Sequence, residues 1–132
     1  MKKIFSLIAI PVLTSISFLA VASDRPQEDA RKMDESTVVR KAVNYNCGHG
    51  QRLKVTYGFN KQGLPTYAQA YLSGKTRFMP INLNLSDMVG TTFGDDNNFS
   101  LHTAGITSKK YRADIQVQSP SSEIIYKSCS AR

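Results

Sequence analysis

The stretch from Leu53 to Leu85 constrains the fold more than any other part of the chain. Its first part, up to Phe59, alternates large apolar residues with charged or small ones, the period-two pattern of a β-strand with one buried face. Asn60 to Gly63 then interrupts the pattern with residues that tolerate the positive φ angles of hairpin turns. A second strand, a short turn and a third strand follow at Thr66–Leu72, Ser73-Gly74 and Lys75–Met79. The stretch therefore predicts a β-meander, in which three antiparallel strands are joined by two short turns.

Short strand-like segments continue on both sides of the meander. They lie at Ala42–Cys47, Thr91–Phe93 and Phe99–Thr103, around Ile115 and Val117, and at Glu123–Cys129. Two longer loops separate some of them, one at Leu85–Gly90 and one at Ala104–Lys110. About eight short strands at intervals of roughly ten residues are typical of an all-β antiparallel barrel or sandwich. We expect the barrel, because closure of the sheet leaves no bare edge.

The first 22 residues have the pattern of a secretory signal peptide. Lys2 and Lys3 precede an apolar run from Ile4 to Leu19, and Ala20-Val21-Ala22 supplies the small residues that a signal peptidase requires. We expect cleavage after Ala22 and an exported mature protein. A retained membrane anchor is the alternative, but Pro11 and several polar residues make the run a poor match to a span of about 20 apolar residues. The mature chain is therefore expected to have no transmembrane span.

The next segment, residues 23–41, is expected to be a charged, flexible leader ahead of a folded domain at residues 42–132. It contains five acidic and five basic residues and almost no apolar residue that could be buried. The formal net charge is +7 for the whole sequence and falls to +5 when Lys2 and Lys3 are removed with the signal peptide. Because the leader is neutral overall, the surplus of +5 lies on the folded domain.

Cys47 and Cys129 are the only two cysteines, one at the start of the folded region and one near its end. In an exported protein such a pair is expected to form a disulfide, and only one pairing is possible. The bond would tie the first strand to the last, which favours closure into a barrel. The alternative is a reactive thiol or a metal ligand, but no cluster of His or Cys residues supports it.

No group of residues in the sequence predicts catalysis or a metal site. His49 and His102 are the only histidines, and neither has the spacing of a metal site or a catalytic dyad. We expect His49 in a turn and His102 outward-facing or hydrogen-bonded. Ser86-Asp87 lacks the nucleophile elbow of a hydrolase, and Asp95-Asp96 lacks the spacing of a calcium loop, so a plain turn is expected there. The sequence favours a binding protein without a cofactor, acting through rim loops or an outer face.

Several segments of the chain resemble a known family. They are Val55–Leu64, Thr66–Ala68, Met79–Leu83, Ser86-Asp87 and Lys127–Ser130, which look like the corresponding parts of the neisserial adhesin complex protein family. That family is similar in turn to the periplasmic and membrane-bound inhibitors of c-type lysozyme. The resemblance implies a small flattened eight-stranded barrel at the outer-membrane surface or in the periplasm. It also implies inhibition of host c-type lysozyme and a part in adhesion to host cells.

The resemblance further implies which residues contact lysozyme. The related inhibitors use a loop that contains a serine, and Ser86, followed by Asp87, is the nearest match to it. They also use a lysine within a Thr-Lys-Gly segment. Here Thr103 and Gly105 match that segment, but Ala104 stands where the lysine would be.

Two lysines that follow shortly afterwards, Lys109 and Lys110, are possible substitutes for the missing one. The alternative is that both belong to a solvated loop with no partner.

The charge of the domain supports a second hypothesis. C-type lysozymes are generally basic, so a domain of charge +5 would be repelled from them at long range. A surface adhesin whose basic face binds acidic glycans or lipopolysaccharide would instead use the charge directly. Its candidate residues are Arg52, Lys54, Lys75, Arg77 and Arg112. Nucleic acid is not expected as a partner, because the protein is predicted to be exported and lacks the aromatic spacing of base-stacking surfaces.

Overall fold

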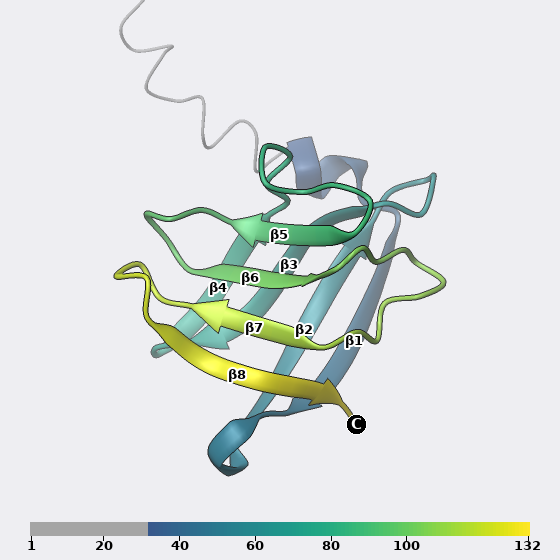
Figure 1. Cartoon of the computed structure of the whole chain (residues 1–132). Coiled ribbons are helices and arrows are strands. Elements are labelled where there is room, and N and C mark those ends of the chain that lie inside the picture. The colour runs from purple at the N-terminus through teal and green to yellow at the C-terminus, as the bar shows by residue number, and fades with distance from the viewer. Residues whose placement is uncertain (1–31) are drawn as a thin grey trace, which may run out of the picture.

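Eight antiparallel strands form one continuous sheet that curls into a nearly closed, flattened barrel (Figure 1). The structure is a computed structural model, and it describes residues 32–132. The strand order is β4-β3-β2-β1-β8-β7-β6-β5, so that β1–β4 and β5–β8 make the two walls. The strands are β1 (Val39–Asn46), β2 (Arg52–Phe59), β3 (Pro65–Leu72), β4 (Lys75–Pro80), β5 (Gly90–Gly94), β6 (Ser100–Ala104), β7 (Ile115–Gln118) and β8 (Ile124–Ala131). The predicted all-β eight-stranded barrel is confirmed.

The predicted meander is β2, β3 and β4, with both turns where the sequence placed them. Asn60 accepts hydrogen bonds through its side-chain oxygen from the backbone N–H groups of Gln62 and Leu64, which fixes the first turn. In the second turn Ser73 and Gly74 both have positive φ angles, 50° and 89°. Such a pair of angles matches the right-handed twist of the flanking strands, which pair directly at Leu72 and Lys75.

The first strand begins earlier than expected, at Val39 rather than Ala42. Val39 pairs with Phe59, so the last residues assigned to the leader belong to the sheet. Residues 32–36 form a short helix, and the buried Thr37 shares a hydrogen bond of 2.6 Å with the Thr66 hydroxyl. The exposed residues at the start of β1 gain their structure from long-range pairing with β2, which a local pattern does not record. The predicted signal peptide and residues 23–31 lie outside the described residues.

A disulfide reinforces a strand junction that has few backbone pairs. β1 and β8 pair through only two residue pairs, Tyr45 with Ala131 and Asn46 with Ser130. The predicted bond between Cys47 and Cys129 is present directly beside them and is confirmed. On the other side of the barrel β4 and β5 meet through a single bridge between Ile81 and Phe93. The barrel is therefore closed by covalent linkage on one side and by a loose contact on the other.

The interior of the barrel is filled by side chains from both walls. The largest fully buried ones include Tyr45, Tyr57, Phe59, Phe93 and Leu72. Tyr45 and Tyr57 satisfy each other through a hydrogen bond of 2.7 Å between their hydroxyl groups. Because the core is packed with side chains, binding surfaces have to lie on its ends or its outside. Over residues 32–132, no helix has the length and apolar character needed to cross a membrane.

Candidate functional site

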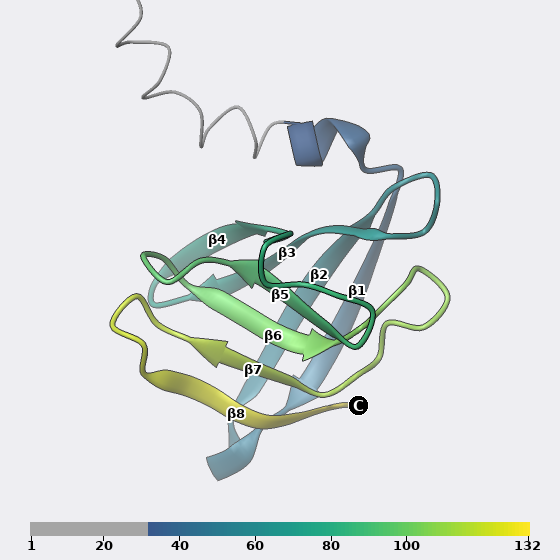
Figure 2. The same ribbon diagram turned by 45° about the horizontal axis from the view of Figure 1, so that its top comes forward.

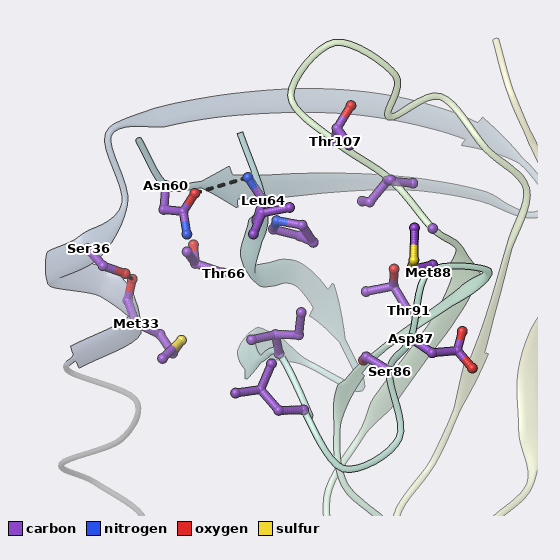
Figure 3. A pocket seen from close by; sticks show the side chains of 15 residues that line it. Met33, Ser36, Asn60, Leu64, Thr66, Ser86, Asp87, Met88, Thr91 and Thr107 are labelled. Atoms are coloured by element: carbon purple, nitrogen blue, oxygen red, sulfur yellow. Dashed lines mark hydrogen bonds between the residues drawn. The ribbon is translucent and has the colours of Figure 1, made fainter. Parts of the chain in front are cut away.

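One end of the barrel carries a hollow of about 480 Å³. Four segments surround it: the helix at residues 32–36, the β2–β3 turn, the loop that joins β4 to β5, and the start of the β6–β7 loop (Figure 2). Met33 lies on one side of the hollow and Met88 on the other, as Figure 3 shows. Leu64, Ile81 and Ile106 contribute further apolar lining. The end of the barrel thus presents an open apolar depression with loops around it.

The loop between β4 and β5 is fixed to the free edge of β5 by two polar side chains. The backbone N–H of Asn82 donates to the carbonyl of Thr92 at 2.8 Å, and its side-chain amide donates to the carbonyl of Gly94 at 2.9 Å. The Ser86 hydroxyl donates to the carbonyl of Asn82 at 2.7 Å and accepts from the backbone N–H of Thr92 at 3.0 Å. Ser86 therefore holds the loop in place, and its proton is already used within the fold.

Asp87 shapes the tip of the same loop. Its carboxylate oxygen Oδ1 accepts from the backbone N–H groups of Val89 and Gly90 at 2.9 Å and 2.8 Å. These two backbone hydrogen bonds, first that of Gly90, stabilise the charged form and lower the pKa of the Asp87 carboxyl group. The side chain is exposed, so the ionised carboxylate is also accessible to a partner.

The residues at the tip of this loop are apolar and exposed. Met88 is 96% exposed and Val89 is 80% exposed. Leu83 and Leu85, on the same loop, are 72% and 56% exposed. The sequence motifs predicted Ser86 and Asp87 as site residues but not these four neighbours. The sequence feature that could have identified them is the presence of large apolar residues in a segment predicted to be an irregular loop.

Gly105 also lines the hollow, whereas Thr103 does not. The backbone N–H of Gly105 donates to the carbonyl of Val89 at 3.0 Å, which joins the β6–β7 loop to the Met88-Val89 tip. A Cβ atom at Gly105 would lie 2.3 Å from the carbonyl oxygen of Met88. Thr103 is part of β6, and its hydroxyl donates to the carbonyl of Asp114 at 2.8 Å. Of the predicted residues, Ser86, Asp87 and Gly105 therefore line the hollow together.

The two candidate lysines lie on the far side of the β6–β7 loop. Lys109 and Lys110 are exposed, in a tight turn whose backbone N–H groups donate to the hydroxyl of Thr107. The backbone N–H of Ser108 donates to the carbonyl of Gly63 at 2.9 Å and so holds this turn against the β2–β3 turn. Within residues 32–132 neither lysine forms an ion pair. Both ammonium groups are accessible, beyond the rim formed by Thr107.

The five candidate basic residues of the glycan hypothesis differ in whether their charged groups already have a partner within the fold. Arg77 donates to the carbonyl of Leu72 at 3.0 Å and lies 4.6 Å from the centre of the Phe99 ring. Arg112 donates to the carbonyl of Arg132 at the carboxyl end of the chain. Both guanidinium groups are thus engaged within the fold. The exposed members of the set without such a contact among the described residues are Arg52, Lys54 and Lys75.

Both histidines have the structural roles that the sequence predicted. His102 lies between two hydroxyl groups, with Nδ1 3.2 Å from Thr92 Oγ1 and Nε2 3.1 Å from Ser100 Oγ. Burial lowers the pKa of His102, and the charge of Asp96 opposes that shift. His49 occupies a short 3₁₀ turn with a φ angle of 61°.

The acidic segment after β5 forms the predicted plain turn. The Asp95 carboxylate accepts from the backbone N–H of Asn97 and from the side-chain amide of Asn98, each at 2.9 Å. In the part of the chain that the structure describes, no cluster of three His, Cys, Asp or Glu side chains could hold a metal ion.

Comparisons with known proteins agree with the fold and with the motifs. Residues 41–131 match the family model Nm-ACP, described as an ACP-like domain. The solved adhesin complex protein from Neisseria meningitidis is 42% identical, with 70% of this chain and 99% of that chain covered and a TM-score of 0.66. PliC-St, a periplasmic inhibitor of c-type lysozyme from Salmonella typhimurium, is 17% identical over 71% of this chain and 99% of its own, with a TM-score of 0.51. That second likeness concerns the fold alone.

A comparison with curated protein sequences finds no match. The match to the family model nevertheless includes residues of all eight strands, and the alignment with the neisserial protein covers most of the described residues. The chain therefore belongs to the ACP-like domain family, as its sequence motifs predicted.

Proposed function

We propose that this protein is an exported inhibitor of host c-type lysozyme that acts through the loop end of its barrel. The observation that carries the proposal is the hollow, where an ionised carboxylate and exposed apolar side chains lie around one opening, with two accessible lysines beyond its rim. Exposed features of this kind contribute little to the stability of the barrel and are typical of a surface that binds a partner. The fold shared with a periplasmic lysozyme inhibitor supports the same conclusion.

The chemistry of lysozyme explains why lysines would matter. Lysozyme works with one protonated and one ionised carboxyl group across a cleft. An ammonium group placed between them would donate charge-assisted hydrogen bonds to both and would exclude the substrate. Lys109 and Lys110 are the candidates, because both are exposed and lie on a turn fixed against its neighbour at Gly63.

Ser86 has a different role in this proposal from the one the resemblance suggests. Its hydroxyl proton is donated within the loop, so a contact with lysozyme would have to use the remaining acceptor capacity of the oxygen. We assign to Ser86, Asp87 and Gly105 the task of holding the loop in its binding conformation. Thr103 supports the β6–β7 loop from its base through its bond to Asp114.

A bacterial cell-wall lysis assay with human lysozyme tests the function. Purified mature protein is expected to suppress lysis, and the double variant K109A/K110A to suppress it at least tenfold less effectively. Lys54→Ala removes a charge that is also exposed, from the outer face of β2, and is the matched control, which should inhibit like the parent protein. Undiminished lysis with the parent protein would refute the proposed function.

A second candidate function is adhesion through acidic glycans. The observations that favour it are the exposed side chains of Arg52, Lys54 and Lys75 and the similarity to a protein named as an adhesin. An adhesin of this kind would leave lysis unaffected and would bind an anionic polysaccharide such as heparin, with an affinity that falls steeply as salt is added. The triple variant R52A/K54A/K75A would lose that binding.

Export and location belong to the same proposal. The predicted signal peptide at residues 1–22 would deliver the protein across the inner membrane, to the periplasm or the outer-membrane surface. The periplasmic inhibitor that shares the fold supports this location. Amino-terminal sequencing of protein recovered from the cell envelope is expected to begin at Ser23.

A further inference from the structure

We propose that Met88 and Val89 form an apolar tip that enters the hydrophobic part of the lysozyme cleft and supplies much of the binding free energy. This inference rests on the proposed function and names the part of the loop end that makes the contact. The polar residues of the same loop then act as its scaffold. The surface of lysozyme that this tip would contact is the cleft, a groove with an apolar, aromatic wall beside its carboxyl groups.

The first observation is that the two side chains have no structural use in the barrel. Met88 is 96% exposed and Val89 is 80% exposed, although both are among the residue types most often buried in folded proteins. Single exposed apolar residues are common, but here two adjacent ones occupy the tip of a loop, with the exposed Leu83 and Leu85 near its base. Four exposed apolar side chains on one loop indicate a surface that another molecule covers.

The second observation is that the tip is held in one conformation by several independent bonds. Asp87 Oδ1 accepts from the N–H groups of Val89 and Gly90, while the N–H of Asp87 donates to the carbonyl of Gly90 at 2.8 Å. The N–H of Gly105 donates to the carbonyl of Val89 from the other side. A loop that is already ordered loses little conformational entropy on binding, so more of its contact energy appears as affinity. The bonds therefore suit a preformed binding element.

The third observation concerns charge. The tip itself is uncharged, and the nearest ionised side chain on its loop is the anionic Asp87. The tip itself therefore adds no repulsion toward a basic partner, even though the domain as a whole is cationic. Apolar burial offers an attraction that the net charge of the two proteins does not oppose.

The apolar tip also suits the chemistry of the lysozyme cleft. In lysozyme the catalytic acid has a raised pKa because it lies in a hydrophobic pocket against a tryptophan. A methionine side chain adapts its shape to such a wall, and its sulfur makes favourable contacts with aromatic rings. Burial of Met88 there would also remove water from the carboxyl groups that Lys109 or Lys110 reach. The apolar tip and the lysines are thus complementary parts of one interface.

The test measures inhibition of human lysozyme by Met88→Ser, Val89→Ser and the double variant. Full burial of a methionine side chain corresponds to an expected loss of about tenfold to a hundredfold in affinity for Met88→Ser. Ile124→Ser changes an aliphatic residue that is 49% exposed on β8, far along the chain from this loop, and is expected to change affinity less than about twofold. Since all these side chains are exposed, unchanged thermal unfolding verifies that each variant is folded.

Met88→Leu supplies the rescue arm, because leucine restores an apolar side chain of similar size; it is expected to inhibit within about threefold of the parent protein. If the parent protein inhibits lysozyme and the double serine variant inhibits equally well, the inference is wrong and the proposed function stands. If the parent protein itself does not inhibit, both are wrong.

Discussion

Tyr45 and Tyr57 place two hydroxyl groups in the apolar interior of the barrel, where each is the other's hydrogen-bond partner. Burial is the main cause that raises the pKa of both phenols, strongly for Tyr57. A phenol with a raised pKa in the folded state keeps its proton there, whereas the unfolded chain loses it near pH 10. Stability is therefore unaffected below about pH 10 and falls as the pH rises above that value.

Urea unfolding at a series of alkaline pH values measures this effect. We expect the free energy of unfolding to decrease by up to about 1.4 kcal/mol per pH unit for each of the two tyrosines. Tyr57→Phe should lower stability by about 1 kcal/mol at neutral pH, because the Tyr45 hydroxyl loses its partner. In the Tyr57→Phe variant the free energy of unfolding should also fall less steeply with pH, because one fewer phenol loses its proton on unfolding. An equally steep decline in the variant would contradict this account.

Ser86 illustrates at the same scale why a motif does not reveal a role. The sequence and the family resemblance both single out this residue, and the structure does place it at the rim of the hollow. Its hydroxyl, however, is bonded to the Asn82 carbonyl and to the Thr92 N–H. Those partners become neighbours only when the loop folds onto β5, so no local pattern could have predicted them.

At the scale of elements, the contact between the β4–β5 loop and the β6–β7 loop depends on the absence of a side chain at Gly105. Gly105→Ala would bring Cβ to within 2.3 Å of the Met88 carbonyl oxygen, so the loop tip must move. We expect a loss of about 1–3 kcal/mol in the free energy of unfolding, and weaker lysozyme inhibition because the tip is displaced.

Gly90→Ala is the matched control for this change, since Gly90 begins β5 directly after the loop tip and the atom nearest to its Cβ would be 3.8 Å away, an ordinary contact. Urea unfolding of the two variants decides the matter. Equal stability of Gly105→Ala and Gly90→Ala would show that the two loops are not packed as described.

The strands themselves were largely predictable, because alternation of apolar and polar residues is a local property. Val55, Tyr57 and Phe59 alternate in sequence and are all buried in β2. The start of β1 was not predictable in this way, since Val39 is ordered by its pairing with Phe59, 20 positions along the chain. The apolar loop tip could not be predicted from alternation either, because Met88 does not belong to a periodic apolar pattern and its side chain is exposed.

For the molecule as a whole, the disulfide is expected to be a major contributor to stability. It joins residues 82 positions apart, next to a strand junction with only two residue pairs. The chain-entropy model gives about 4.5 kcal/mol for a loop of this length, and typical native disulfides contribute about 2–5 kcal/mol. The double variant C47S/C129S should lose that amount in urea unfolding. Reductant should destabilise the parent protein to the same level and leave the variant unchanged.

Net charge provides a test that separates the two proposed functions without any mutation. The domain is cationic, and c-type lysozymes are generally basic, so their approach is slowed by repulsion that extends over the Debye length. That length shrinks from about 30 Å at 0.01 M salt to about 8 Å at 0.15 M. The association rate constant with lysozyme should therefore rise with added salt, while dissociation, governed by the apolar tip, changes little. Binding to an acidic glycan should weaken over the same range. Stopped-flow measurements in both buffers distinguish the cases, and a lysozyme association rate that falls with salt would contradict the repulsion expected from the net charge of the domain.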